Sequence, residues 1–455
     1  MDDVEMDHLA GEVDALGDAL DQERFRHVAG VEAEPALAVA FAARGRAAHK
    51  DTVAALREAG RDDLAARVAA LRADRAAAEQ EEAWRAADAG ASGLGPRGRE
   101  PLAALEEALP RERDPERRAA LARAAADALA PVASAREAWA EARARARAEV
   151  GLAPDWPAVV EADAALASSD DAWRDVSAWA ARRALGDAAG AGLSRADLLR
   201  VLALARRDGS FRPGMLAVAL KLTLEGLGLD AARVRVDDSP RPAKWPGAHA
   251  VGARVSYRPR GGGGDWQDLL AAAARALCAS AAPLSRRDPV LGEAPAWLLG
   301  SLVLEPRWLA ARADAERRDA ADLVRELALR RLFGLRCDAA ALRVATEVER
   351  GLSGRAWRDA HRDALAAATG AAWDPARASR DADAAALSAR VRGAAAGEKL
   401  RVEVRERFDE DWWRNPRTAS HLAALLAAGR LPESDAMPPV AGAARALVAR
   451  LEGGA

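Results

Sequence analysis

The sequence is poor in several residue types, and each shortage excludes a class of protein. Two cysteines among 455 residues, Cys278 and Cys337, cannot form a disulfide framework, so a reducing cytoplasm is the expected location. No apolar run is long enough to span a bilayer, and residues 1–21 are too acidic and polar for a signal peptide. Basic and acidic residues nearly balance, 67 against 70, which gives no general attraction to nucleic acid or to an anionic membrane.

Tyrosine, isoleucine and lysine are also scarce. Tyrosine occurs only at Tyr257, isoleucine is absent, and lysine occurs only at Lys50, Lys221, Lys244 and Lys399. This bias is typical of a GC-rich genome. The frequent choice of arginine over lysine, and the many alanines, therefore carry little functional information.

Most of the chain has the composition and the periodicity of α-helices. Alanine, leucine, arginine and glutamate, which favour helix, dominate the sequence, and apolar residues recur at helical spacing, as at Leu64, Val68 and Leu71. Glycine and proline predict breaks at 88–101, at Pro110, at Pro131 and at 154–157. We therefore predict an N-terminal lobe over residues 1–190 that consists of helices only.

A second region, residues 191–455, differs in its local signals. Ser194 and Asp197 have the spacing of a helix-capping box just before an apolar run. At 233–236 and again at 254–257 the pattern alternates as in a strand, with prolines between the two stretches. The pattern then returns to helix up to the C-terminus. The fold class is therefore mainly α, with one small β-sheet at about 233–258.

A glycine run at 261–264 leads into the helix on which the functional argument depends. Asp265 is the expected N-cap of this helix, and Trp266, Leu269 and Leu277 share one face, which we expect in the core. A glycine run before a helix can bind phosphate, but neither Gly-Lys-Ser/Thr nor a strand-GxGxxG-helix pattern is present. Nucleotide binding is therefore not expected.

The segments around this helix resemble one family in their order and spacing. They are Asp-x-x-x-Arg-Pro-x-Lys at 237–244, Tyr-Arg-Pro-Arg-Gly-Gly at 257–262, Asp-Trp-Gln-Asp-Leu-Leu at 265–270, Ala-Trp-Leu-Leu at 296–299, Leu-Val-Leu-Glu-Pro-Arg-Trp-Leu at 302–309 and Arg-Phe-Asp-Glu-Asp-Trp-Trp-Arg-Asn-Pro at 407–416. The set is similar to the oligoendopeptidase F and thimet-oligopeptidase group of zinc peptidases from about residue 95 onward, most strongly over 190–430. The resemblance implies a two-lobed helical fold with a small β-sheet beside a deep cleft.

In that family the helix carries His-Glu-x-x-His, and a later helix supplies a glutamate as the third zinc ligand. The resemblance places the first histidine on Ala271, the general-base glutamate on Ala272, the second histidine on Arg275 and the glutamate ligand on Glu293. A methyl group donates no electron pair, and a guanidinium does not deprotonate to do so. Only a vestigial ligand, Glu293, remains, so zinc, the cofactor of active relatives, is not expected to bind.

According to the same resemblance, the tyrosine that stabilises the oxyanion is also missing. The positions of the tyrosine that stabilises the oxyanion in the family fall on Ala386 and Arg390, and the single tyrosine, Tyr257, lies far upstream. Without metal, general base and oxyanion donor, no catalytic residues are expected.

Five residues remain as candidates for the cleft: Arg275, Glu293, Cys278, His249 and Tyr257. We expect Arg275 to pair with Glu293, because an unpaired buried carboxylate would be costly and a guanidinium can replace the charge of the metal. Cys278 and His249 could belong to a rewired metal site. We disfavour that alternative because a single cysteine on a core helix is usually a small buried hydrophobe, and because Arg275 would repel a cation.

The two histidines downstream, His361 and His421, are expected at the surface or at helix ends. The expected function is a catalytically inactive, metallopeptidase-like protein that binds a peptide or a partner protein in the inherited cleft. The first alternative is a zinc metallopeptidase for oligopeptides with a rewired metal site. The second is a degenerate product that retains only its fold. The sequence leaves the oligomeric state open.

Overall fold

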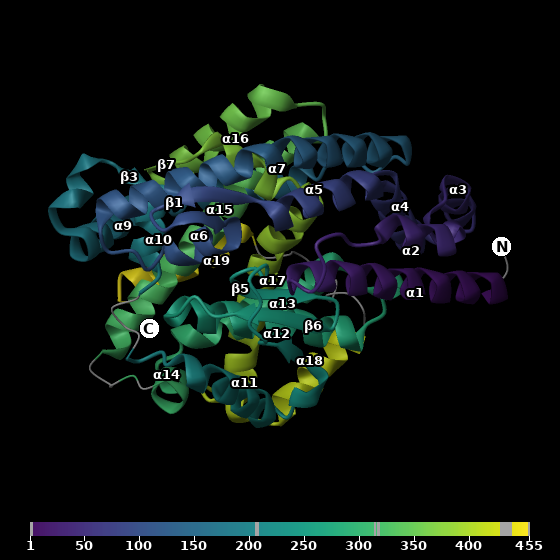
Figure 1. The fold of residues 1–455 in the computed structure, drawn as a ribbon. Coiled ribbons are helices and arrows are strands. Elements are labelled where there is room, and N and C mark those ends of the chain that lie inside the picture. Colours follow the sequence, from purple (N-terminus) through teal and green to yellow (C-terminus); the bar gives the residue numbers. More distant parts are fainter. Residues whose placement is uncertain (1–2, 205–208, 314, 316–318, 428–438, 454–455) are drawn as a thin grey trace.

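The chain folds into layers of helices around small β-sheets (Figure 1). The predicted mainly α class is confirmed, but the described residues form two two-stranded sheets besides the predicted small sheet. The computed structural model describes residues 3–204, 209–313, 315, 319–427 and 439–453. Its helices before residue 190 are α1 (Asp3–Val28), α2 (Leu37–Ala43), α3 (Lys50–Glu58), α4 (Asp62–Ala76), α5 (Ala78–Gly90), α6 (Leu102–Ala108), α7 (Pro115–Glu149), α8 (Trp156–Ala167) and α9 (Asp170–Leu185). None of the described helices is long and apolar enough to cross a membrane.

Two of our predictions for this first part were wrong. Helix α7 continues through Pro131, because Leu129 and Val132 on either side of it are buried with Leu105 of α6, and that packing outweighs one lost backbone hydrogen bond. The prediction that residues 1–190 consist of helices only was also wrong, since β1 (Ser92–Gly95) and β2 (Gly98–Pro101) form an antiparallel hairpin within the predicted break at 88–101. The breaks at Pro110 and at 154–157 are present.

The hairpin is possible because glycine supplies what other residues cannot. Gly98 has φ +102°, which turns the chain between the strands, and a Cβ on Gly93 would overlap the carbonyl oxygen of Ala124 in α7. The glycines that predicted a break in the helices are therefore needed for a tight turn and for the close approach of the hairpin to α7.

The middle of the chain carries the sheet that the sequence predicts. The elements of this middle part of the chain are β3 (Leu193–Ser194), α10 (Arg195–Leu202), α11 (Pro213–Leu227), β4 (Arg235–Asp237), β5 (Gly247–Val251), β6 (Arg254–Arg258) and α12 (Gly263–Ala281). The Ser194–Asp197 capping box at the start of α10 is confirmed. In the sheet, β6 lies between β4, to which it is parallel, and β5, to which it is antiparallel.

The motif Asp-x-x-x-Arg-Pro-x-Lys forms a closed ion cluster in the loop between β4 and β5. Lys244 is fully buried, and its Nζ donates to the carbonyl oxygen of Asp237 at 2.5 Å, to the carboxylate of Asp237 and to the carbonyl oxygen of Ser239, both at 3.2 Å. Arg241 donates to the other carboxylate oxygen of Asp237 at 2.7 Å. This motif therefore fixes the loop that leads into the sheet.

Replacing Lys244 by methionine should lower the free energy of unfolding by about 2–3 kcal/mol, because its buried acceptors lose a charged donor. The same change at Lys221, whose side chain is 68% exposed, should cost under about 0.5 kcal/mol. Urea unfolding of both variants measures the difference. Equal effects at the two positions would show that the loop does not depend on this cluster.

Helix α12 begins three residues earlier than the sequence predicts. Gly262, with φ +82°, precedes the first helical residue, and Asp265 lies inside the first turn instead of at the N-cap. Its Oδ2 accepts hydrogen bonds from the backbone N–H groups of Arg260 at 2.7 Å and Gly261 at 2.6 Å. The predicted core face of α12 is confirmed, since Trp266 and Leu269 are buried in the main hydrophobic core.

After α12, the residues that the structure describes form helices and their connections, apart from β7 (Ala371–Ala372), which pairs with β3. The helices are α13 (Pro289–Gly300), α14 (Pro306–Arg312), α15 (Ala320–Val348), α16 (Gly354–Thr369), α17 (Ala384–Phe408), α18 (Arg417–Ala427) and α19 (Val440–Leu451). Short 3₁₀ helices connect them, among them Leu284–Arg286, Ser301–Leu304, Pro375–Asp381 and Trp412–Arg414. The boundary between lobes near residue 190 remains a prediction.

Candidate functional site

Helices α12, α13 and α17 pack together and border a cavity of about 400 Å³, the central cavity. Two glycines of α17 allow the close approach: a Cβ on Gly393 would overlap the side chain of Glu293, and one on Gly397 would lie 2.5 Å from the carbonyl oxygen of Ala294. Helix α15 closes another wall of the cavity. The packing therefore brings segments that lie far apart in the sequence to one place.

The ion pair expected between Arg275 and Glu293 is present. Nε of Arg275 donates to one carboxylate oxygen of Glu293 at 2.8 Å, and Nη2 donates to the other at 2.7 Å. This two-pronged contact is the strongest geometry for a guanidinium and a carboxylate. Burial alone would raise the pKa of Glu293, but the Arg275 guanidinium outweighs burial and lowers it. Glu293 is therefore a charged group that is already neutralised.

The other positions implied by the resemblance lie in different surroundings. Ala271 lines the central cavity, whereas Ala272 is fully buried in the main hydrophobic core. Ala386 lies in the first turn of α17 and does not line the cavity. Arg390, one turn further on, does line it, and its Nε donates to the carboxylate of Asp338 of α15 at 3.1 Å.

Sequence reasoning missed Arg331, which also lines the central cavity. Its side chain projects from α15, is 8% exposed, and lies over the ring of Trp297 with 3.8 Å between the guanidinium carbon and the ring centre. Its Nη2 donates to the carbonyl oxygen of Trp297. A signal for it exists: Arg331 occupies one place in the buried stripe Leu323, Leu327, Arg331, Leu335, where a leucine would be ordinary.

The cavity carries more positive than negative charge. Among its described lining residues, five are arginines, at positions 260, 275, 330, 331 and 390, and three are acidic, at 268, 293 and 338. Each of the three carboxylates has an arginine partner; that of Asp268 accepts from Arg330 at 2.7 Å and from Arg260. Arg331 forms no ion pair with any described residue. The site therefore holds one guanidinium without an anionic partner.

Three of the five predicted cleft residues do not line this cavity. Cys278 is buried with its Sγ 3.9 Å from the carbonyl oxygen of Leu291, and burial raises the pKa of its thiol to about 12. Tyr257 donates to Asp265 at 3.3 Å, and burial raises its pKa well above the usual range. His249 lies 3.1 Å from the carbonyl oxygen of Pro246, and burial lowers its pKa.

Our expectation for His361 was wrong. The side chain is 1% exposed, and its Nε2 lies 3.1 Å from the carboxylate of Asp381, because α16 packs against the 3₁₀ helix Pro375–Asp381. The prediction failed because the sequence of α16 does not show which other segment of the chain covers the helix face that carries His361. His421 pairs with Glu403 at 3.0 Å, and its side chain is 13% exposed.

The side chains at the positions implied by the resemblance do not fit a zinc ion. Ala271 offers no electron pair, Arg275 offers a fixed positive charge, and Glu293 is engaged by that charge. No histidine in the sequence is followed by glutamate, so the motif His-Glu-x-x-His occurs nowhere in it. Among the described residues, no group of three His, Cys, Asp or Glu side chains could hold a metal ion.

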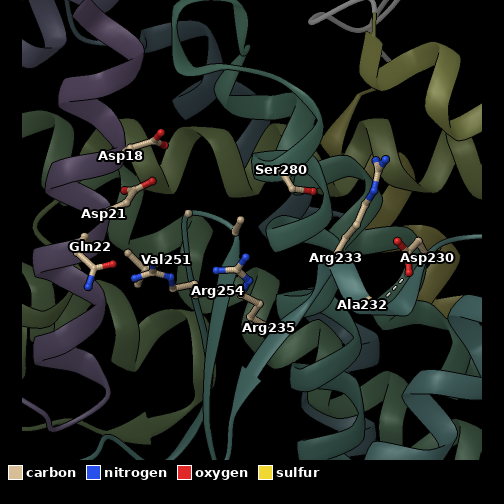
Figure 2. Close-up of a pocket in the computed structure, with 12 residues that line it drawn as sticks. Asp18, Asp21, Gln22, Asp230, Ala232, Arg233, Arg235, Val251, Arg254 and Ser280 are labelled. Atoms are coloured by element: carbon tan, nitrogen blue, oxygen red, sulfur yellow. Dashed lines mark hydrogen bonds between the residues drawn. The ribbon is translucent and has the colours of Figure 1, made fainter.

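A second cavity of about 550 Å³ lies between α1 and the loops at the end of the three-stranded sheet (Figure 2). Figure 2 shows Asp18 and Asp21 on α1 at the left, with Arg254 in the middle and Arg233 on the opposite side, and Arg235 also lines the cavity. Together with Asp230, the described lining has three carboxylates and three guanidiniums. This balance gives the second cavity no preference for the charge of a ligand, in contrast to the central cavity.

The fold is similar to the solved structures of two peptidases. An M32 carboxypeptidase from Deinococcus radiodurans R1 superposes with a TM-score of 0.56 at 14% identity, over 99% of this chain and 100% of that one. PZ peptidase A with inhibitor 2 superposes with a TM-score of 0.58 at 10% identity, over 86% of this chain and 79% of that one. No protein-family model and no curated protein matches the sequence. At these identities the likeness shows the fold: the chain has the helical architecture of a metallopeptidase.

Proposed function

We propose that the chain is a peptidase-like protein without peptidase activity, and that it binds peptides in the central cavity. The observation that carries this proposal is the direct contact of Arg275 with Glu293. Hydrolysis in such a fold needs an activated water, which a metal or a general base must supply. In this chain the resemblance places Ala271, Ala272 and Arg275 at those positions. They offer two methyl groups, one of them inside the core, and a cation.

The cavity retains features that suit binding. Its volume of about 400 Å³ accommodates a few side chains, and Trp297 and Phe333 provide aromatic surface beside the charged groups. Arg275 and Arg390 each keep 35% of their side-chain surface exposed, so the cavity is open to solvent. Because Cys278 and Cys337 are both free thiols, we also propose a cytoplasmic location.

The experiment compares metal content, cleavage and binding in one preparation. Protein purified without added zinc should contain far less than one equivalent of metal, and a library of fluorescent oligopeptides should bind without being cleaved. Calorimetry measures binding and mass spectrometry measures cleavage. Stoichiometric zinc together with chelator-sensitive cleavage would establish the alternative, a zinc metallopeptidase with different ligands.

A matched pair of variants locates the binding. Ala271→Trp should fill the central cavity and weaken peptide binding at least about tenfold, because Ala271 lines it. Ser280→Trp, on the same helix but in the wall of the second cavity, should bind peptides as the unmodified protein does. If no peptide binds to the folded protein, the chain retains its fold without this function.

A further inference from the structure

The lining of the central cavity contains three buried donor atoms without an acceptor among the described residues: Nε of Arg330, Nε of Arg331 and Nε2 of Gln267. The side chains of Arg331 and Gln267 are more than nine-tenths buried, at 8% and 6% exposure. Each unpaired buried donor costs free energy, so an acceptor supplied by a ligand in the cavity would be stabilised at these donors.

The guanidinium of Arg331 lies beside the part of α12 that carries Gln267 and Ala271. A Cβ placed on Gly300 would lie 2.7 Å from Nη1 of Arg331, 3.3 Å from the Cβ of Ala271 and 3.4 Å from the backbone oxygen of Gln267. Glycine at this position therefore lets the guanidinium lie between α12 and the end of α13. The guanidinium lies next to Ala271, at the part of the wall where the resemblance places a zinc ligand.

Nearby carboxylates do not neutralise Arg331. Glu398 is 2.8 Å from Arg401 and also accepts from the Trp297 indole at 3.3 Å, and Asp268 is shared by two other arginines. Burial lowers the pKa of Arg331 to about 9, and the charge of Glu398 offsets only part of this. The positive charge of the Arg331 guanidinium is therefore only partly balanced by the carboxylates around it, and a bound anion would balance it further.

We propose that Arg331, assisted by Gln267, binds a carboxylate group of the peptide ligand. This inference rests on the proposed function, and it names the chemical class of the ligand: a peptide that carries a negative charge. The guanidinium lies on the ring of Trp297, and its planar arrangement of N–H donors matches a carboxylate. The excess of two guanidiniums over carboxylates in the lining favours the same charge.

Three pentapeptides with blocked N-termini test the proposal by calorimetry at constant ionic strength. The first has glutamate at the centre and an amidated C-terminus, the second has glutamine instead of glutamate, and the third has glutamine and a free C-terminal carboxylate. The glutamate peptide, the free-terminus peptide or both should bind about tenfold more tightly than the neutral peptide, since one charge-assisted contact is lost in the latter. Which charged peptide binds better tells whether the carboxylate comes from a side chain or from the terminus.

Variants of Arg331 then assign the preference to this side chain. Arg331→Leu should reduce the advantage of the charged peptide to under about twofold, and Arg331→Lys, which keeps the charge without the planar fork, should retain part of it. Arg343→Gln removes a charge from the exposed face of the same helix and should leave the advantage unchanged. Thermal unfolding checks that each variant is folded. If Arg331→Leu does not fold, Arg331→Lys is used to test the preference instead.

The outcomes separate the two proposals. If all three peptides bind equally well, or if the preference persists in both Arg331 variants, the carboxylate site is refuted while peptide binding stands. If none binds, the proposed function itself fails.

Discussion

Zinc should bind stoichiometrically to a variant that combines Ala271→His with Arg275→His. Residues 271 and 275 are one helical turn apart on α12, and the present contact of Arg275 with Glu293 shows that side chains at 275 and 293 converge. Two histidines four residues apart and one glutamate form a common set of three protein ligands for a catalytic zinc site. The change therefore replaces a cation by two nitrogen donors and frees the third ligand.

The effect is measured as zinc content after desalting and as a thermal midpoint that falls when a chelator is added. Zinc at 100 times its dissociation constant should stabilise the folded protein by about 2.7 kcal/mol. Ala271→His alone should bind no zinc, because Arg275 still repels the ion and occupies Glu293. Adding Arg331→Leu to the double variant should tighten zinc binding further, since the Arg331 guanidinium lies beside position 271.

Peptidase activity is not expected from this variant, because position 272 is buried in the core and carries no general base. A folded double variant that contains no zinc would show that positions 271, 275 and 293 do not form one ligand set. In that case the resemblance to the zinc peptidases would not extend to their metal site.

Arg275→Met should destabilise the protein by about 1–2 kcal/mol, because it leaves the Glu293 carboxylate without its partner. Removing one partner of a fully buried pair costs about 3–5 kcal/mol, and we reduce this figure because the Arg275 side chain is 35% exposed. Combining Arg275→Met with Glu293→Leu should restore most of the loss, since neither charge then remains unpaired. Urea unfolding of the single and double variants gives the coupling directly.

The pH dependence of this variant has a defined sign. The pKa of Glu293 is lowered in the folded protein from an ordinary value of 4.5, so the pair stabilises the fold above pH 4.5 and this contribution disappears as the pH falls through the folded pKa. The difference between Arg275→Met and the unmodified protein should therefore shrink below pH 4.5. As a control, Arg343→Gln breaks an exposed pair with Asp163 and should cost under about 0.5 kcal/mol at any pH.

The sequence predicted one part of the central cavity well. The Arg275–Glu293 pair followed from two positions that would share a metal, and the ion pair is present because α12 and α13 pack side by side. The sequence could not predict that Arg331 lines the cavity. An arginine among leucines at helical spacing can equally mean that the buried face of the helix was assigned wrongly. Only the packing of α15 against Trp297 and Gly300 places that guanidinium in the cavity.

Local chemistry determined much of this protein from the sequence alone. Helix-forming residues, the Ser194–Asp197 capping box and the alternation near residues 235 and 255 fixed the helices and the small sheet, because these signals act over a few residues. Tertiary packing decided the rest: it carried α7 through Pro131, buried His361 against Asp381, and left Nε of Arg331 without an acceptor among the described residues. Such outcomes depend on which distant segment covers a side chain, and a pattern within one segment carries no information about that.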